Sequence, residues 1–220
     1  MLGIVALLAL VTVAYAGGWV IVTVRDVPEY AVAGRPLQLT LMVRDVGGSP
    51  ADGLTPNIAA KSEAEMVRAP AVMTKNAGEY TATLVLPRRG NWTIQFNAFD
   101  DSSRWERSML PELTVIAPGS SAPAPMSQAT LGERLFSAKG CNGCHVHPEV
   151  KEGRVYGPDL TGRRFAPEYL KRFLADPSMT PVPETVCSRD GSYCGSPYAM
   201  PNLNLKDAEI DALVAFIVKK

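Results

Sequence analysis

The residues most able to do chemistry form a short motif in the second half of the chain. Cys141 and Cys144 are separated by Asn142 and Gly143, and His145 follows at once. In this pattern the two thiols add across the vinyl groups of a haem, and the imidazole becomes an axial ligand of its iron. A zinc half-site would need a second pair of closely spaced ligands, and a thioredoxin-type redox pair would not need the histidine. The motif therefore predicts one covalently attached haem c.

A methionine further along the chain is the candidate for the second axial ligand. Met200 is followed by Pro201 and lies a few residues before the last predicted helix. A thioether opposite imidazole stabilises Fe(II) and raises the reduction potential. Met179 and Met126 are the alternatives, although a lone methionine more often fills a gap in a core. The pattern therefore predicts His145 and Met200 as the two metal ligands.

Charge and the N-terminal segment bear on partners and location. The 220 residues include 22 basic and 22 acidic side chains, which favours one or two domains and no nucleic-acid partner. Residues 2–16 are an uncharged apolar run that ends in Ala-Tyr-Ala, which is typical of a cleaved export signal. A retained membrane anchor is the alternative if the run continues through residue 24. Both alternatives predict a protein in the periplasm or on the outer face of the cytoplasmic membrane.

Residues 17–116 have the pattern of an all-β domain. Short runs of β-branched and aliphatic residues alternate with turn signals rich in Gly, Asn and Asp. The predicted strands are residues 19–24, 37–43, 80–86, 92–99 and 113–116, with weaker ones near 57–61 and 65–69. About seven short strands in about 100 residues are typical of a Greek-key β-sandwich of immunoglobulin type.

The β region lacks the side chains that a redox metal prefers. Both histidines and all four cysteines lie after residue 140. A blue-copper or binuclear copper centre, which needs imidazole and thiolate ligands, is therefore excluded from this region. A thioether site for Cu(I) is the remaining alternative, and the scatter of its candidate residues favours core filling instead. Those candidates are Met42, Met66, Met73 and Met109.

Four short segments of the β region resemble YtkA-like domains, which are small extracytoplasmic immunoglobulin-like modules. The segments are Val-Pro-Glu-Tyr at 27–30, Ala-Gly-Arg-Pro at 33–36, Gly-Glu-Tyr-Thr-Ala at 78–82 and Gly-Asn-Trp-Thr-Ile at 90–94. This resemblance implies a fold and no chemistry. A spacer rich in Pro, Gly, Ser and Ala follows at residues 117–126, which predicts that the two domains fold separately.

Residues 127–220 are predicted to be all-helical. A first helix passes through residues 131–138, a middle one covers 167–174 with proline at its first turn, and an amphipathic one covers 207–217. With the haem motif and Met200, these residues resemble the class I monohaem cytochromes c. The complete chain is thus predicted to be multi-domain, with an N-terminal immunoglobulin-like sandwich followed by an all-α cytochrome c domain.

The cytochrome resemblance assigns further roles to individual residues. It implies that Gly132 and Phe136 of the first helix cross Phe216 of the last one. It also implies that the carbonyl of Pro158 accepts a hydrogen bond from Nδ1 of His145, which orients the ring. The expected wall of the haem pocket consists of Leu160, Tyr169, Phe173, Leu203 and Leu213.

Three remaining polar side chains of the cytochrome region are His147, Cys187 and Cys194. His147 is too close to His145 to reach the opposite face of a haem, and we expect it to be solvated near the haem edge. The two cysteines lie outside the cytoplasm in an insert before Met200, where a structural disulfide is the expected state. The alternative is a labile, redox-sensing pair.

The predicted function is transfer of single electrons through one haem c, without catalysis of its own. The expected partners are a donor and an acceptor protein, within or beside a membrane respiratory or photosynthetic complex. Membrane association would come through the N-terminal segment. The alternative is a structural or assembly subunit of a membrane redox complex, in which the sandwich docks and the haem is an embedded relay.

Overall fold

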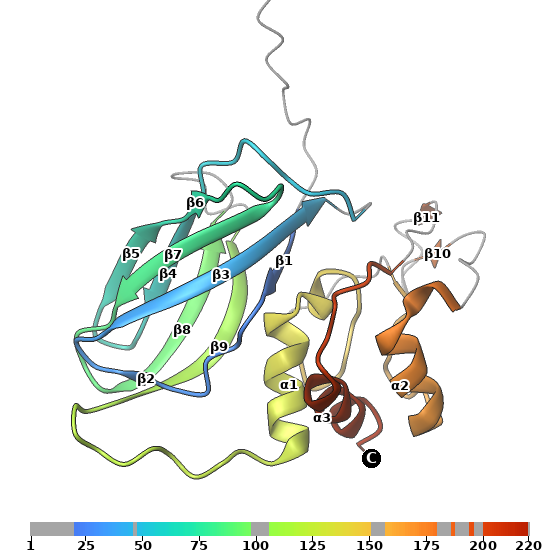
Figure 1. The fold of residues 1–220 in the computed structure, drawn as a ribbon. Helices are drawn as coiled ribbons and strands as arrows, with labels where there is room; N and C mark the ends of the chain where they lie inside the picture. Colours follow the sequence, from blue (N-terminus) through green and yellow to red (C-terminus); the bar gives the residue numbers. More distant parts are fainter. Residues whose placement is uncertain are drawn as a thin grey trace, which may run out of the picture.

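The computed structural model describes residues 20–45, 48–97, 106–150, 157–179, 186–187, 194–195 and 200–219. The N-terminal part is mostly β-sheet and the C-terminal part is helical, in the predicted order (Figure 1). The export signal or anchor predicted at residues 1–16 lies outside the described residues. Within the described part, every helix is too short or too polar to traverse a lipid bilayer.

The β part consists of two sheets. The first has the order β1-β3-β7-β6 and is antiparallel throughout. Its strands are β1 Val20–Val24, β3 Pro36–Asp45, β6 Val72–Met73 and β7 Glu79–Val85. The second has the order β2-β9-β8-β4-β5, in which only the short β2–β9 pair among the described strands is parallel. Its strands are β2 Ala31–Val32, β4 Asn57–Lys61, β5 Met66–Pro70, β8 Gly90–Asn97 and β9 Glu106–Ile116.

The predicted strands correspond to observed ones, and the differences have local causes. Strand 57–61 coincides with β4, and most others differ by one or two residues at their ends. The two-residue strands β2 and β6 were not predicted because two residues contain no alternation. β9 begins at Glu106 instead of 113, since Pro111 interrupts the apolar pattern there. The ladder with β8 shifts register at this place, as is usual where a proline enters a strand.

Alternation places one face of each long strand in a common core. Buried residues of β3, β7 and β8 recur at every second position and belong to one cluster drawn from both sheets. They are Leu39, Leu41 and Val43, then Tyr80, Ala82 and Leu84, then Trp92, Ile94 and Phe96. Two methionines that were expected in the core are instead exposed at the sheet edges: Met66 is 49% and Met73 is 47% exposed. That expectation was wrong because both lie on short strands at the edges of the sheets.

Strand β1 differs from the others because all five of its residues are buried. Val20, Val22 and Val24 face the core that the two sheets share. Ile21 and Thr23 point to the opposite face, which on an outer strand would normally meet water. The helical part covers this face, and Figure 1 shows β1 beside the first helix.

The helical part contains α1 Gln128–Ala138, α2 Pro167–Ala175 and α3 Asp207–Ile217. The last helix coincides with its prediction, and α2 is one residue longer. α1 begins earlier than predicted, because the Oγ of Ser127 accepts the N–H of Thr130 at 3.1 Å and caps the first turn. The helical part also contains two 3₁₀ helices, Cys141–Gly143 and Pro177–Met179. A short hairpin pairs β10 Val186–Cys187 with β11 Cys194–Gly195. Residues 117–126 contain no helix or strand, as expected of a spacer.

Candidate functional site

The Cys-x-x-Cys-His motif forms a single tight turn shortly after the end of α1. Gly140 has a left-handed φ of 79° and reverses the chain after the helix. The N–H of Cys144 then bonds to the carbonyl of Cys141 at 3.1 Å, and the N–H of His145 bonds to the same carbonyl at 2.9 Å. Neither thiol of the motif is in a disulfide. The turn therefore presents two thiols outside any disulfide and one imidazole together.

A second segment orients the imidazole of His145. Residues 157–160 run beside the motif, with Gly157 N–H donating to Cys144 O at 2.8 Å and Leu160 N–H donating to Val146 O at 2.9 Å. These bonds place the carbonyl oxygen of Pro158 2.8 Å from Nδ1 of His145. A carbonyl only accepts, so Nδ1 carries the proton and Nε2 is left as the atom able to bind a metal.

Gly157 is a residue of this site whose role the sequence did not reveal. A Cβ built on it would lie 2.8 Å from Nδ1 of His145 and would overlap the adjacent ring carbon. Its φ is not in the left-handed region, so the requirement here is for space and not for backbone freedom. The Gly-Pro pair in the sequence was a usable signal, because glycine before an orienting carbonyl lets a ring approach the backbone closely.

Burial shifts the pKa values of Cys141 and His145 in the direction that favours their uncharged forms. Desolvation, together with the neighbouring Cys144 thiol, raises the pKa of Cys141 to about 12. Desolvation also lowers the pKa of His145, against the opposing effect of the hydrogen bond to Pro158. In addition, no group of three or more His, Cys, Asp or Glu side chains in the described part of the chain could hold a metal ion. The Cys-x-x-Cys-His set itself fits a haem attached through two thioethers.

The crossing of α1 and α3 forms the apolar base of the site. A Cβ on Gly132 would lie 2.7 Å from Cβ of Phe216 and would overlap the backbone carbonyl of Ala212. The rings of Phe136 and Phe216 meet edge to face with centroids 5.7 Å apart. Absence of a side chain at residue 132 thus permits the close crossing that the cytochrome resemblance implied.

Three of the five expected pocket residues belong to the core around this crossing. Leu213 is fully buried in it, and Leu160 and Tyr169 pack against it from the side. Phe173 is half-buried and stacks on Tyr169 with ring centroids 6.0 Å apart. Leu203 is half-buried outside the cluster, while Leu205, which was not predicted, packs against it.

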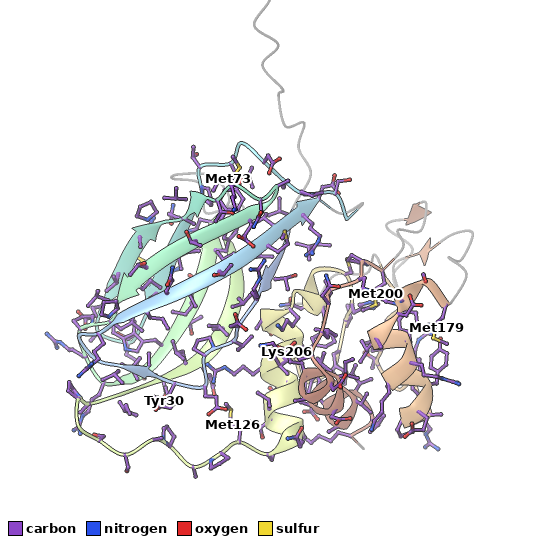
Figure 2. The ribbon with its side chains drawn as sticks, viewed as in Figure 1. Tyr30, Met73, Met126, Met179, Met200 and Lys206 are labelled. Carbon is purple, nitrogen blue, oxygen red and sulfur yellow. The ribbon has the colours of Figure 1, made fainter. Side chains whose placement is uncertain are left out.

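The three candidate methionine ligands occupy different places (Figure 2). Met200 packs against the core of the helical part together with Cys141. Met179 is 43% exposed in the 3₁₀ helix that follows α2. Met126 lies just before α1, at the end of that helix remote from the Cys-x-x-Cys-His turn. Of the three, only Met200 shares an apolar environment with the motif.

The expectation that His147 is solvated was wrong. Its side chain is only 7% exposed, and its ring lies 4.2 Å from that of Phe216 and 5.7 Å from that of Phe136. Its Nδ1 accepts the N–H of Glu149 at 3.3 Å. A histidine two residues from a haem ligand is polar by sequence, but the helix crossing offers it an aromatic surface to pack on.

Because His147 is buried as a neutral ring, acid should weaken the fold. Burial lowers the pKa of this imidazole below its ordinary 6.5, so the unfolded chain binds the proton more readily. This contribution to stability is present above pH 6.5 and is lost as pH falls through the lower folded value. We expect the free energy of unfolding of His147→Phe to fall less than that of wild type between about pH 7.5 and 5. Denaturant titrations of both proteins measure this, and parallel pH profiles would contradict it.

The insert cysteines lie on paired strands. Cys187 of β10 and Cys194 of β11 are direct Cα partners in an antiparallel register. Directly opposed antiparallel residues have Cα atoms about 4.5 to 5.5 Å apart, within the range that a disulfide spans. Their side chains lie outside the described residues, so the predicted bridge stays a prediction.

Comparison with known proteins identifies the helical part. Residues 127–217 match the family described as "Cytochrome C oxidase, cbb3-type, subunit III". These residues thus form a cytochrome c domain, which indicates covalently bound haem c and electron transfer. Domains of this type are typically extracytoplasmic. No curated protein sequence matches the chain.

Solved structures resemble the chain only weakly. Surface layer protein SbsC, domains 1–6, is 17% identical with a TM-score of 0.33, over 48% of this chain and 14% of that one. The Lin-41 filamin domain is 13% identical with a TM-score of 0.31, over 43% and 90%. A superoxide reductase (neelaredoxin) from Ignicoccus hospitalis is 19% identical with a TM-score of 0.28, over 46% and 82%. At these TM-scores none of the three likenesses bears on the chemistry of the chain.

Proposed function

We propose that this protein is an extracytoplasmic electron carrier that passes single electrons through one haem c, to or within a membrane respiratory or photosynthetic complex. The observation that carries the proposal is the Cys-x-x-Cys-His turn with His145 held by the Pro158 carbonyl, inside a cytochrome c domain. Its immunoglobulin-like β domain, of YtkA-like type, precedes the spacer. Donor and acceptor are proteins, and nucleic acid is not a partner.

Each side chain of the site has one task in this proposal. A haem c supplies a one-electron iron couple, which none of the side chains of the site can supply alone. Cys141 and Cys144 would hold it by thioether bonds, His145 would bind its iron through Nε2, and Met200 would supply the second protein ligand. The hydrogen bond from His145 to Pro158 fixes the ring and makes it a stronger donor. With both iron ligands supplied by the protein, little rearrangement would accompany a change of charge.

The direct test combines haem content with electron delivery. The exported protein should contain one haem c per chain by its alkaline pyridine spectrum, and the reduced protein should be oxidised by membranes from its native source. The Cys141→Ser/Cys144→Ser double variant is the matched control and should contain no covalent haem. A wild-type protein without covalent haem, or one that native membranes neither oxidise nor reduce, would contradict the proposal.

A disulfide between Cys187 and Cys194 is part of this proposal, since the bridge stiffens the insert that precedes Met200. Closing this loop contributes roughly 2.5 kcal/mol to stability in the chain-entropy model. We expect Cys187→Ser/Cys194→Ser to lose about that much free energy of unfolding. Alkylation of the native protein without reductant should label neither cysteine, and labelling of both in freshly isolated protein would disprove the bridge.

A second candidate function rests on the outer surface of the β part. Val72 and Val85 are 62% and 46% exposed on β6 and β7, and Met66 and Met73 are also exposed on β5 and β6. Exposed apolar residues on neighbouring strands suit a lasting contact with another protein. The protein would then be an assembly subunit whose haem is an embedded relay. Co-purification with a membrane complex that survives salt washing would favour this role, whereas release by salt would favour the mobile carrier.

A further inference from the structure

The outer face of β1 packs directly on the haem-attachment turn. Ile21 points away from the β core and is only 4% exposed. A Cβ on Gly140 would lie 2.9 Å from Cγ2 of Ile21 and 2.7 Å from the carbonyl oxygen of Val22. A Cβ on Gly143 would lie 3.5 Å from Cγ1 of Ile21. The Ile21 side chain therefore occupies the space that Gly140 leaves open, and it lies close beside Gly143.

A second contact reaches the segment that carries Met200. A Cβ on Gly48, in the turn after β3, would lie 3.6 Å from Cβ of Pro201. Pro201 follows Met200 directly in the chain. The β part thus lies close to the segments of both proposed axial ligands, with β1 packed on one and Gly48 beside the other.

A buried lysine forms polar contacts with both the β part and the helical part. Lys139, the residue after α1, is 3% exposed, and its Nζ donates to the carbonyl of Arg25 at 2.8 Å. The same Nζ pairs with Glu209 of α3 at 2.7 Å. Its backbone carbonyl accepts the hydroxyl of Thr23 at 3.2 Å. A buried cation satisfied from both parts of the chain indicates a permanent interface, because separation would leave a polar network incomplete.

Further polar contacts extend this interface along the segment after β1. The guanidinium of Arg134 in α1 donates to the carbonyls of Pro28 at 2.6 Å and Glu29 at 2.9 Å. At the surface, Lys206 pairs with Asp26 at 2.7 Å. The proline-rich spacer predicted two separately folding domains, and this interface shows why that expectation was incomplete: a flexible spacer permits docking as well as separation.

We infer that the β part supports the haem site, with Ile21 as a positioning residue for the attachment turn and the turn at Gly48 as a support for the Met200 segment. The inference rests on the proposed haem protein, and it gives the β part a role that the family match at residues 127–217 does not include. Loosening either segment lets a ligand move relative to the other, and weaker sulfur ligation lowers the potential. The outer face of β1 is consequently not available to an external partner.

The test uses the complete holoprotein and three substitutions. Ile21→Ala removes the contact with the turn, and Ile21→Val retains most of it. Ile58→Ala is the matched control, since Ile58 is equally buried but lies on β4 in the core of the β part. Carbon monoxide must displace the methionine from ferrous haem, so its affinity reports the strength of that ligation. Reduction potential and melting temperature are measured beside it.

We expect Ile21→Ala to bind carbon monoxide at least threefold more tightly than wild type and to have a lower potential. The carbon monoxide affinity and potential of Ile21→Val should lie between those of wild type and Ile21→Ala. Ile58→Ala should match wild type in both quantities, although its melting temperature should fall about as much as that of Ile21→Ala. Equal affinities and potentials for Ile21→Ala, Ile58→Ala and wild type would overturn the inference. Equal changes in both alanine variants would also overturn it, because general destabilisation would then be the cause.

A second experiment needs no substitution at the interface. A protease site placed in the exposed spacer, residues 117–126, allows the folded holoprotein to be cut there. The two halves should stay together on gel filtration, or, if they separate, the haem half should bind carbon monoxide more tightly. Halves that separate with unchanged affinity and potential would overturn the inference. The proposed function fails independently, if the uncut wild-type protein carries no covalent haem or exchanges no electrons with native membranes.

Discussion

Replacing Met200 with alanine is expected to lower the reduction potential by more than about 0.1 V, within the roughly 0.8 V range that axial ligands set. As the proposed ligand, the Met200 thioether would stabilise Fe(II), and alanine would leave that face to water or to no protein ligand. The side chain packs with Cys141 against the apolar core, so its loss should change ligation without unfolding the domain. Potentiometric titration of wild type and variant measures the effect.

Met179→Ala is the matched control for this experiment. Met179 is 43% exposed and lies on the 3₁₀ helix after α2, so its removal should leave the potential within error of wild type. A large fall in Met179→Ala with none in Met200→Ala would transfer the ligand to Met179. Unchanged potentials in both variants would exclude methionine ligation by either residue.

A valine at residue 132 is expected to destabilise the helical part by about 3 kcal/mol. Its Cβ would overlap the carbonyl of Ala212 on α3, and a backbone carbonyl cannot rotate away as a flexible side chain can. The helices must then move apart, which also opens the contact between Phe136 and Phe216. Chemical denaturation followed by helix content gives the free energy of unfolding.

The neighbouring position supplies the control for Gly132→Val. Glu133 is exposed on the same helix, so Glu133→Val introduces the same β-branched side chain without touching α3. We expect it to cost well under 1 kcal/mol, which is the helix propensity difference alone. Similar losses in the two variants would show that propensity and not the helix crossing limits stability.

The interface between the two parts changes how the spacer is understood. Hydrogen bonds of Lys139 with Thr23 and Arg25 join residues more than 100 positions apart. The β part is therefore positioned relative to the haem turn by specific contacts as well as by the length of residues 117–126. Electron delivery must then use a surface of the cytochrome domain that β1 leaves uncovered.

Local sequence patterns were sufficient to predict the Cys-x-x-Cys-His turn, the last helix and the long strands β3, β7 and β8. Spacing alone places Cys141, Cys144 and His145 on one turn, because residues three and four apart meet across a helical turn. The α3 bounds followed from its apolar period, with acidic residues in its first turn and a Lys beyond its end. Alternation likewise located β3, β7 and β8, since each has one face in the common core.

Tertiary structure decided which residues are buried by contact with another segment of the chain. In β1, alternation assigns Ile21 and Thr23 to the face away from the core but cannot say that helices bury that face. His147 is polar by type, yet packing beside Phe216 makes it a core residue. The neighbour of Gly48 is Pro201, which comes from a distant segment, so their closeness is invisible to any pattern of spacing. Sequence periodicity reports which face of an element is apolar, whereas only the folded chain determines what covers the other face.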